Sequence, residues 1–220
     1  MNPFDLMLIY ERLLKAYGHQ HWWPADTQDE VIIGTILTQN TNWQNVEKAI
    51  AQLKENRLCT LQGIIDADED YLASCIVPSG YFRVKAKRLK AVATALLSID
   101  IDKFNDEKLR KYLLSVHGIG CETADSIMLY AYQRVSFVID TYTKRILNRI
   151  GIGVNKESYG YFYSLFMDNL THDVGLFNEY HALIVRNAKV ACKVKPDCLE
   201  CPVKDLCDYG RNNESTITTR

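Results

Sequence analysis

The stretch LLSVHGIGCETADSIMLYAYQRVSFVIDTYTKR, from Leu113 to Arg145, decides the fold that we expect. It predicts a helix that ends at Val116, a tight turn through Gly118 and Gly120, and a second helix over about 121–133. Two glycines in a G-x-G spacing can turn the chain sharply and point backbone N–H groups outward, and the next helix adds the positive end of its dipole. We therefore interpret Gly118 and Gly120 as a seat for the phosphates of a nucleic-acid backbone.

A lone carboxylate follows this turn about twenty residues later. The apolar run 135–139 leads to Asp140, directly before the helix predicted from Thr141. The glycine turn and the sequence Val138-Ile139-Asp140-Thr141 together resemble the helix–hairpin–helix and catalytic aspartate of the endonuclease III-like DNA glycosylases. The resemblance implies that Asp140 is the catalytic residue. Taken alone, each motif also fits an ordinary helical corner with Asp140 as a helix cap.

Composition limits the classes of protein to consider. A chain of 220 residues with 47% hydrophobic and 24% charged residues can form one large or two small soluble domains. The net charge of −1 excludes a generally basic coat, so any DNA affinity must come from local patches and should depend on salt. No stretch approaches the roughly 20 apolar residues of a membrane span. The seven cysteines do not form a secreted disulfide pattern, so we expect a cytoplasmic protein that binds no membrane.

Hydrophobic periodicity is helical almost throughout and predicts an all-α fold, with helices over about 3–17, 43–55, 82–98 and 175–191. The resemblance spans about 22–207 and implies two helical domains. Residues 23–133 are expected to form a six-helix barrel that contains the hairpin. Residues 1–22 with 134–220 are expected to form the second domain.

Four cysteines lie close together near the C-terminus in the spacing C-x5-C-x2-C-x5-C: Cys192, Cys198, Cys201 and Cys207. Four thiolates so close suit a tetrahedral metal or an iron–sulfur cluster. Zinc sites more often use two separated C-x2-C pairs. The spacing resembles the iron–sulfur loop of the endonuclease III-like enzymes, with the first interval one residue shorter, and implies a 4Fe-4S cluster. Zinc or no metal remains the alternative.

A loop followed by a basic helix suggests a DNA contact. Pro78-Ser79-Gly80-Tyr81-Phe82 precedes five cations within eight residues: Arg83, Lys85, Lys87, Arg88 and Lys90. An aromatic ring that enters a base stack replaces lost stacking while cations hold phosphates. The segment resembles the intercalating loop of the same family, which implies Tyr81, or Phe82, as the wedge and Lys85 and Lys87 as backbone contacts. The alternative is a solvated helix face.

Two further features concern a flipped nucleotide. Gln39, in Leu37-Thr38-Gln39-Asn40-Thr41, matches the family glutamine that fills the gap left in the duplex, since an amide offers donors and an acceptor to the orphaned base. The alternative is a helix cap. Trp22, Trp23 and Pro24 precede this segment, and Trp43 follows it. The three tryptophan rings can stack on a purine and favour a cationic one, although tryptophans are more often core residues. The set resembles the base pocket of the 3-methyladenine glycosylase branch.

One position departs from the family members that also cut the DNA strand. Those enzymes place a lysine two residues after the second hairpin glycine, where it forms a Schiff base. This chain has Glu122 there, and a carboxylate cannot form an imine. Glu122 thus predicts a monofunctional enzyme, and the resemblance implies a DNA glycosylase that removes an alkylated purine, 3-methyladenine, from double-stranded DNA. We expect it to act as a monomer. The alternatives are a glycosylase/lyase for oxidised pyrimidines that uses another lysine, and a DNA-structure binding module without turnover.

Overall fold

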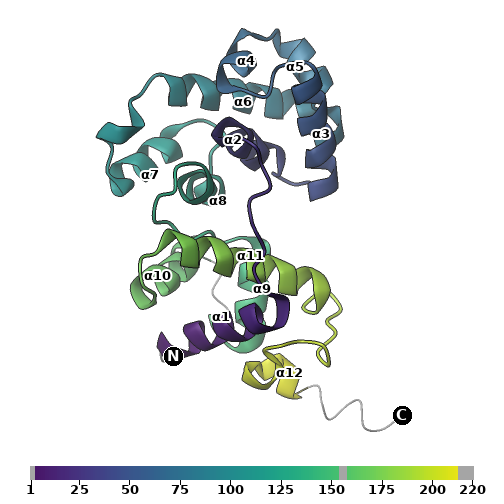
Figure 1. Cartoon of the computed structure of the whole chain (residues 1–220), viewed down its shortest axis with the longest axis vertical. Coiled ribbons are helices and arrows are strands. Elements are labelled where there is room, and N and C mark those ends of the chain that lie inside the picture. Colours follow the sequence, from purple (N-terminus) through teal and green to yellow (C-terminus); the bar gives the residue numbers. More distant parts are fainter. Residues whose placement is uncertain (1–2, 154–157, 213–220) are drawn as a thin grey trace. The chain divides into compact units, whose positions relative to one another are not determined.

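Helices account for the regular structure in the computed structural model, which describes residues 3–153 and 158–212 (Figure 1). No β-strand occurs in these ranges, so the predicted all-α class is confirmed. The α-helices are, in chain order, α1 (Pro3–Tyr17), α2 (Gln28–Leu37), α3 (Trp43–Glu55), α4 (Leu61–Asp66), α5 (Glu69–Cys75), α6 (Phe82–Leu97), α7 (Asp106–Ser115), α8 (Cys121–Ser126), α9 (Thr141–Ile150), α10 (Tyr159–Asn169), α11 (Val174–Val190) and α12 (Asp208–Asn212). Short 3-10 turns are η1 (Val77–Ser79), η2 (Ile101–Lys103) and η4 (Lys204–Leu206). None of the helices in the described ranges combines the length and apolar character that a membrane span needs.

Side-chain caps fix where helices begin. Thr27 Oγ1 accepts a hydrogen bond from Glu30 N (3.2 Å) at the start of α2. The Glu30 carboxylate accepts a hydrogen bond from the backbone N–H of Asp26 (3.0 Å), one residue before the N–H that a capping box usually binds. Asn42 likewise caps α3 by accepting from Asn45 N (3.0 Å).

The second hairpin helix differs from the prediction of one α-helix over 121–133. It is α-helical only over α8 and continues as a π-helical turn, η3 (Ile127–Ala131). The backbone N–H of Tyr132 bonds to the carbonyl of Ile127 (3.1 Å), the i to i−5 pattern of a wider turn. Gln133 then takes a left-handed conformation (φ +51°) that ends the helix and turns the chain into the extended run before Asp140.

The described chain divides into two compact units. One unit, Trp23–Arg134, is built around α2, which packs against α3, α6, α8 and η3. Every residue of α2 from Glu30 to Leu37 is buried, as expected for a helix that is apolar on nearly all sides. The expected barrel range of 23–133 covers the same elements, and the barrel itself stays a proposal.

The other unit consists of residues 1–22 and 135–220, and α11 is its central helix, in contact with α1 and α9. Aromatic rings form much of its core. Phe137, from the extended run before α9, stacks on Phe166 with a centroid distance of 3.7 Å and meets the edges of Phe177 and Tyr180. The run that carries Asp140 is therefore anchored in the core by its own aromatic side chain.

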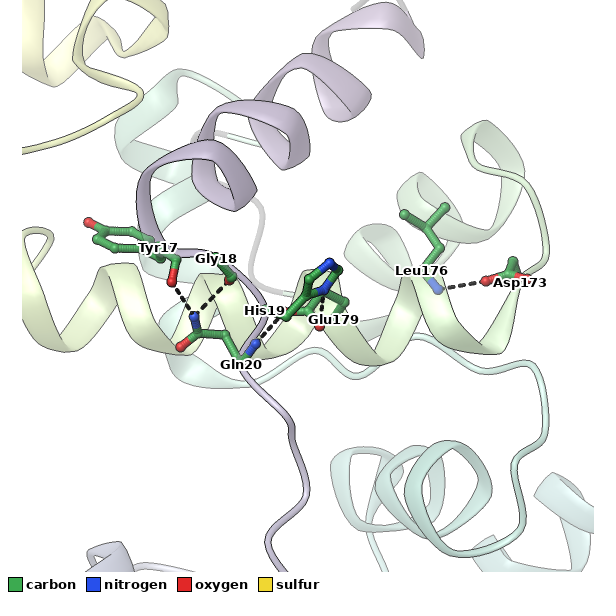
Figure 2. A network of polar contacts seen from close by, with 7 residues as sticks. All are labelled: Tyr17, Gly18, His19, Gln20, Asp173, Leu176 and Glu179. Carbon is green, nitrogen blue, oxygen red and sulfur yellow. Dashed lines mark hydrogen bonds and ion pairs between the residues drawn. The ribbon is translucent and has the colours of Figure 1, made fainter.

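The Glu179 carboxylate of α11 binds the segment that follows α1 (Figure 2). Gly18 (φ +67°) ends α1 in the left-handed conformation common after helices. Glu179 of α11 then accepts a hydrogen bond from the backbone N–H of Gln20 (2.8 Å), and its other oxygen lies 3.1 Å from His19 Nδ1. The Gln20 amide donates back to the carbonyls of Tyr17 and Gly18. These bonds fix the direction in which the chain leaves α1.

Candidate functional site

The glycine turn links α7 to α8 as the sequence predicts. Gly118 has φ +91°, and a Cβ there would lie 2.5 Å from Arg88 Cγ, so both its conformation and its close neighbour require glycine. Gly120 precedes α8 in an extended conformation with open space around it (φ −94°). Neither the backbone angles nor the neighbouring atoms at this position require glycine. The phosphate-binding role of Gly118 and Gly120 stays a prediction.

A buried ion pair braces the two helices of the hairpin. Arg110 of α7 donates through Nε to Asp125 Oδ1 (2.7 Å) and through Nη2 to Oδ2 (3.0 Å). The Asp125 side chain is 0% exposed, whereas that of Arg110 is a quarter exposed. Bidentate geometry of this kind holds both partners in one orientation.

We predict that Arg110→Met lowers the free energy of unfolding by roughly 3 kcal/mol, because it removes the bidentate partner of a fully buried carboxylate. Urea unfolding followed by circular dichroism measures the change. Lys111→Met is the matched control at the exposed neighbouring position and should alter stability by less than about 0.5 kcal/mol. Equal stabilities of the two variants would contradict a bracing role.

Gln39 is held by three contacts inside its own unit. Its Oε1 accepts from Arg88 Nη1 (2.5 Å), and its Nε2 donates to the Gly118 carbonyl (3.2 Å) and to Thr123 Oγ1 (3.0 Å). The Gln39 side chain thus lies beside the hairpin. Its hydrogen bonds connect the α2–α3 turn both to the hairpin and to α6. To enter a duplex it must exchange these partners for a base, so its role as a plug stays a prediction.

Tyr81 is the most prominent aromatic side chain of the loop before α6. It is 71% exposed, and its backbone is left-handed (φ +46°, ψ +32°), directly after Gly80 (φ +69°). A non-glycine residue in this region costs roughly 1–2 kcal/mol, and such strain gathers at functional sites. Phe82 is half-buried. The geometry supports Tyr81 over Phe82 as the wedge.

The predicted role of Lys85 as a contact to the DNA backbone is wrong. Its side chain is 1% exposed, and Nζ donates to the carbonyls of Leu37 (2.8 Å) and Ser79 (2.6 Å). Burial, with the nearby Arg88 charge, lowers the pKa of Lys85 to about 8. An amine bound in this way cannot reach a phosphate or a sugar, so it cannot serve as the alternative Schiff-base lysine either.

The other cations of this helix divide into two kinds. Lys90 is half-buried, and its Nζ donates to the carbonyls of Ile65 (2.9 Å) and Ala67 near the end of α4. Arg83 and Lys87 are exposed. Lys87 therefore remains a candidate for the backbone contact.

Three of the four predicted pocket residues line one cavity of about 230 Å³: Trp23, Pro24 and Trp43. The two tryptophan rings meet edge to face with centroids 5.3 Å apart. This volume is several times the roughly 30 Å³ that one water molecule occupies in the liquid, so the cavity has space for a flat heterocycle. Glu30 and Glu47 also line it, and Glu47 accepts a hydrogen bond from Trp43 Nε1 (2.9 Å). Trp22 does not line this cavity; it belongs to the other unit, where Lys189 Nζ lies 6.0 Å from its ring centroid.

Asp140 caps α9, and it also contacts a histidine that the sequence interpretation missed. Its Oδ1 accepts from the backbone N–H (2.7 Å) and hydroxyl (2.8 Å) of Thr143. Its Oδ2 lies 3.6 Å from Nε2 of His181, a buried residue of α11. Burial alone would raise the pKa of Asp140, but the contact with His181 and the bonds from Thr143 outweigh it. The pKa of the carboxyl therefore lies below its ordinary value. A lone histidine among apolar residues of a predicted helix gives no sequence signal of a partner 41 positions away.

The four clustered cysteines line a second cavity, bordered by Arg149 and Tyr209. Two of the sulfurs accept N–H bonds: Cys192 Sγ from Arg149 Nη1 (3.2 Å) and Cys207 Sγ from Gly210 N (3.4 Å). Arg149 also donates to the carbonyls of Lys193 (2.6 Å) and Val194 (2.9 Å), which fixes the loop that carries the cysteines. In the described ranges, no three His, Cys, Asp or Glu side chains gather closely enough to hold one metal ion.

A family model of the HhH-GPD superfamily of base excision DNA repair proteins matches residues 33–171, which include the hairpin and Asp140. The chain belongs to this superfamily. It thereby belongs with the DNA glycosylases of base excision repair, which agrees with the sequence-based resemblance.

Curated relatives and solved structures agree with this assignment. The HhH-GPD chain is 45% identical over 94% of its length to a candidate DNA repair glycosylase of Methanocaldococcus jannaschii, covering 97% of that protein. It is 30% identical over 83% of its length to the endonuclease III of Sulfolobus acidocaldarius, covering 82% of it. Among solved structures, a 3-methyladenine DNA glycosylase of H. pylori bound to 1,N6-ethenoadenine matches with a TM-score of 0.71 at 28% identity, over 86% of this chain and 98% of that one. An endonuclease III–DNA complex matches with a TM-score of 0.82 at 19% identity, over 98% and 99% of the two chains, and this likeness shows the fold alone.

Proposed function

We propose that this protein is a monofunctional DNA glycosylase that flips an alkylated purine, 3-methyladenine, out of double-stranded DNA and hydrolyses its glycosidic bond. The observation that carries the proposal is the cavity lined by Trp23, Pro24 and Trp43. The 3-methyladenine glycosylase among the solved structures, at 28% identity, supports the same substrate class.

The aromatic and acidic lining of this cavity favours a cationic base. A purine methylated at N3 carries positive charge, which an aromatic face attracts. The carboxylates of Glu30 and Glu47 line the same cavity. Lys54 lines it too, and its Nζ, 2.8 Å from Glu30 Oε2, neutralises part of that charge. The lining can therefore select a damaged base by charge without a dense set of hydrogen bonds to its edge.

Asp140 supplies the charge that hydrolysis of the glycosidic bond needs. As the bond between C1′ and the base nitrogen breaks, the electron pair leaves with the purine and the sugar gains oxocarbenium character. A carboxylate stabilises that cation and orients the water whose oxygen adds to C1′, while the water proton passes to the carboxylate or to solvent. The lowered pKa keeps Asp140 ionised at neutral pH.

His181 acts on the reaction through Asp140. We predict that His181→Gln raises the pKa of Asp140, because it removes a contact that lowers it. The acid limb of the rate–pH profile then moves to higher pH.

Ionised Asp140 also contributes to the stability of the wild type. This contribution is present above the pKa of the carboxyl in the unfolded chain, about 3.9, and is lost as the pH falls through its lower pKa in the folded protein.

Single-turnover base release measured across acidic and neutral pH tests this role. His172→Gln is the matched control, because His172 is exposed and its ring nitrogen Nε2 bonds to the Met167 carbonyl. An acid limb that is the same in His181→Gln and the wild type would show that His181 does not tune Asp140.

Glu122 supports a reaction without strand cleavage. It is exposed in the first turn of α8, where the lyase members of the family carry the imine-forming lysine. The rival function is that of a glycosylase/lyase for oxidised pyrimidines, which we retain because the chain is 30% identical to an endonuclease III. That rival needs another lysine with access to the sugar, and Lys85 is excluded by its burial.

The four cysteines of the C-terminal loop fit an iron–sulfur cluster as cofactor. They surround one cavity, and two of their sulfurs accept N–H bonds of the kind that tune cluster sulfurs. Four thiols around one cavity provide the donor set of a 4Fe-4S cluster, with zinc as the alternative. Cys192, Cys198, Cys201 and Cys207 would hold it, and the cluster would fold the loop against α9 and α12. We further propose that the protein acts as a cytoplasmic monomer on damaged duplex DNA.

The proposal is tested with two duplexes, one carrying 3-methyladenine and one an oxidised pyrimidine, each with and without borohydride. We expect release of free 3-methyladenine, an intact strand and no covalent protein–DNA adduct. Release of the oxidised pyrimidine with a trapped adduct would establish the rival. Binding of both duplexes without release of any base would indicate a DNA-structure binding module.

A further inference from the structure

Lys85 is a buried ammonium that the proposed reaction does not use, and all its contacts serve two DNA-contact candidates. Its Nζ donates to the Leu37 carbonyl (2.8 Å), two residues before Gln39. It also donates to the Ser79 carbonyl (2.6 Å), two residues before Tyr81. Leu37 and Ser79 are both fully buried, so neither carbonyl has water as a replacement partner.

The backbone of Lys85 completes the hold on the loop. Its N–H donates to the Tyr81 carbonyl (2.9 Å). One residue therefore binds the carbonyls of Ser79 and Tyr81, on either side of Gly80, whose φ of +69° marks the turn. Gly80 and Tyr81, the two residues between η1 and α6, both have positive φ, and these bonds hold them in place. Tyr81 is 71% exposed in this arrangement.

The next turn of α6 holds the other candidate. Arg88, three residues after Lys85 and thus on the same side of the helix, donates to Gln39 Oε1 (2.5 Å) and packs against Gly118. The end of α2 is bound by Lys85 at Leu37 and by Arg88 at Gln39. Burial of an ammonium is costly, and the lowered pKa of about 8 reflects that cost while leaving the group charged at neutral pH.

We propose that Lys85 is a positioning residue that ties the Tyr81 loop to the Gln39 turn, so that wedge and plug enter the duplex as one unit when a nucleotide is flipped. The inference rests on the proposed glycosylase function. The ammonium acts by holding backbone carbonyls and does not touch DNA. Its loss therefore affects extrusion of a paired nucleotide and leaves hydrolysis of the extruded one unchanged.

Two matched substrates separate these steps. In the first, 3-methyladenine is paired with thymine; in the second, it lies opposite an abasic site, where extrusion costs less because no partner base is lost. We expect Lys85→Met to lower single-turnover release at least tenfold on the paired duplex and less than threefold on the second. Lys111→Met, at an exposed position of α7 in the same unit, should change the ratio of the two rates by less than twofold.

A uniform loss on both substrates, or no loss on either, would overturn the inference. If Lys85→Met does not fold, as judged by thermal melting, Lys85→Gln keeps N–H donors without the charge and is read in the same way. If the wild type releases no base from either duplex, the proposed function fails. The inference is then tested by fluorescence of 2-aminopurine placed opposite the lesion. Reduced unstacking by the Lys85 variant would support it, and wild-type unstacking would overturn it.

Discussion

Replacing Asp140 with asparagine is expected to lower single-turnover release of 3-methyladenine by at least 10²- to 10³-fold while the protein still folds. The first effect follows because one preorganised group that stabilises transition-state charge is worth about that much. The second follows because Asp140 also caps α9, and asparagine caps helices as well as aspartate does. The variant thus removes the negative charge and keeps the acceptor for the Thr143 N–H.

A second aspartate of the same unit provides the control for the Asp140 variant. Asp173 caps α11 by accepting from Leu176 N (2.6 Å). Asp173→Asn makes the same chemical change at a helix cap and should leave the rate of base release within twofold of the wild type. Unfolding in urea checks that both variants are folded. Equal rates for Asp140→Asn and the wild type would remove Asp140 from the mechanism.

Replacing Cys198 with serine is expected to abolish cluster binding and to lower the melting temperature by roughly 10 °C. Cys198 lines the cavity with the other three clustered cysteines, and Arg149 and Gly210 point N–H groups at two of the sulfurs. Because metal binding of this kind contributes directly to folding, loss of one thiolate removes both the cofactor and the order of its loop.

Iron and sulfide content, with the visible absorbance of the purified protein, measure cluster binding. Cys121→Ser is the matched control, since Cys121 is half-buried at the start of α8 and lies outside the cysteine cluster. We expect four iron atoms per chain in the wild type and in that control. Wild-type protein with one zinc atom per chain and no iron would contradict the proposed cofactor.

Local patterns predicted the helices well because their signals are local. The apolar face of α3, predicted over 43–55, depends on residues within one or two turns of each other. The π-helical turn after α8 was not predicted, because its five buried residues continue an apolar run that fits an α-helix equally well.

Lys85 shows where the interpretation of a charge run goes wrong. It lies on one helical stripe with Leu89, Val92 and Leu96, all buried, and that spacing was the available signal for its burial. The run of five cations concealed it. Leu37, which Lys85 binds, and His181, which Asp140 contacts, lie 48 and 41 residues away along the chain, and such pairs follow from packing that a single sequence does not specify.

The most direct test of the account is chromatographic identification of the bases that purified wild-type protein releases from methylated duplex DNA. The account predicts free 3-methyladenine, with the phosphodiester backbone left uncut, because the cavity favours a cationic purine and Glu122 cannot form an imine. Protein that binds the duplex and releases no methylated base would contradict it, and so would release coupled to strand cleavage.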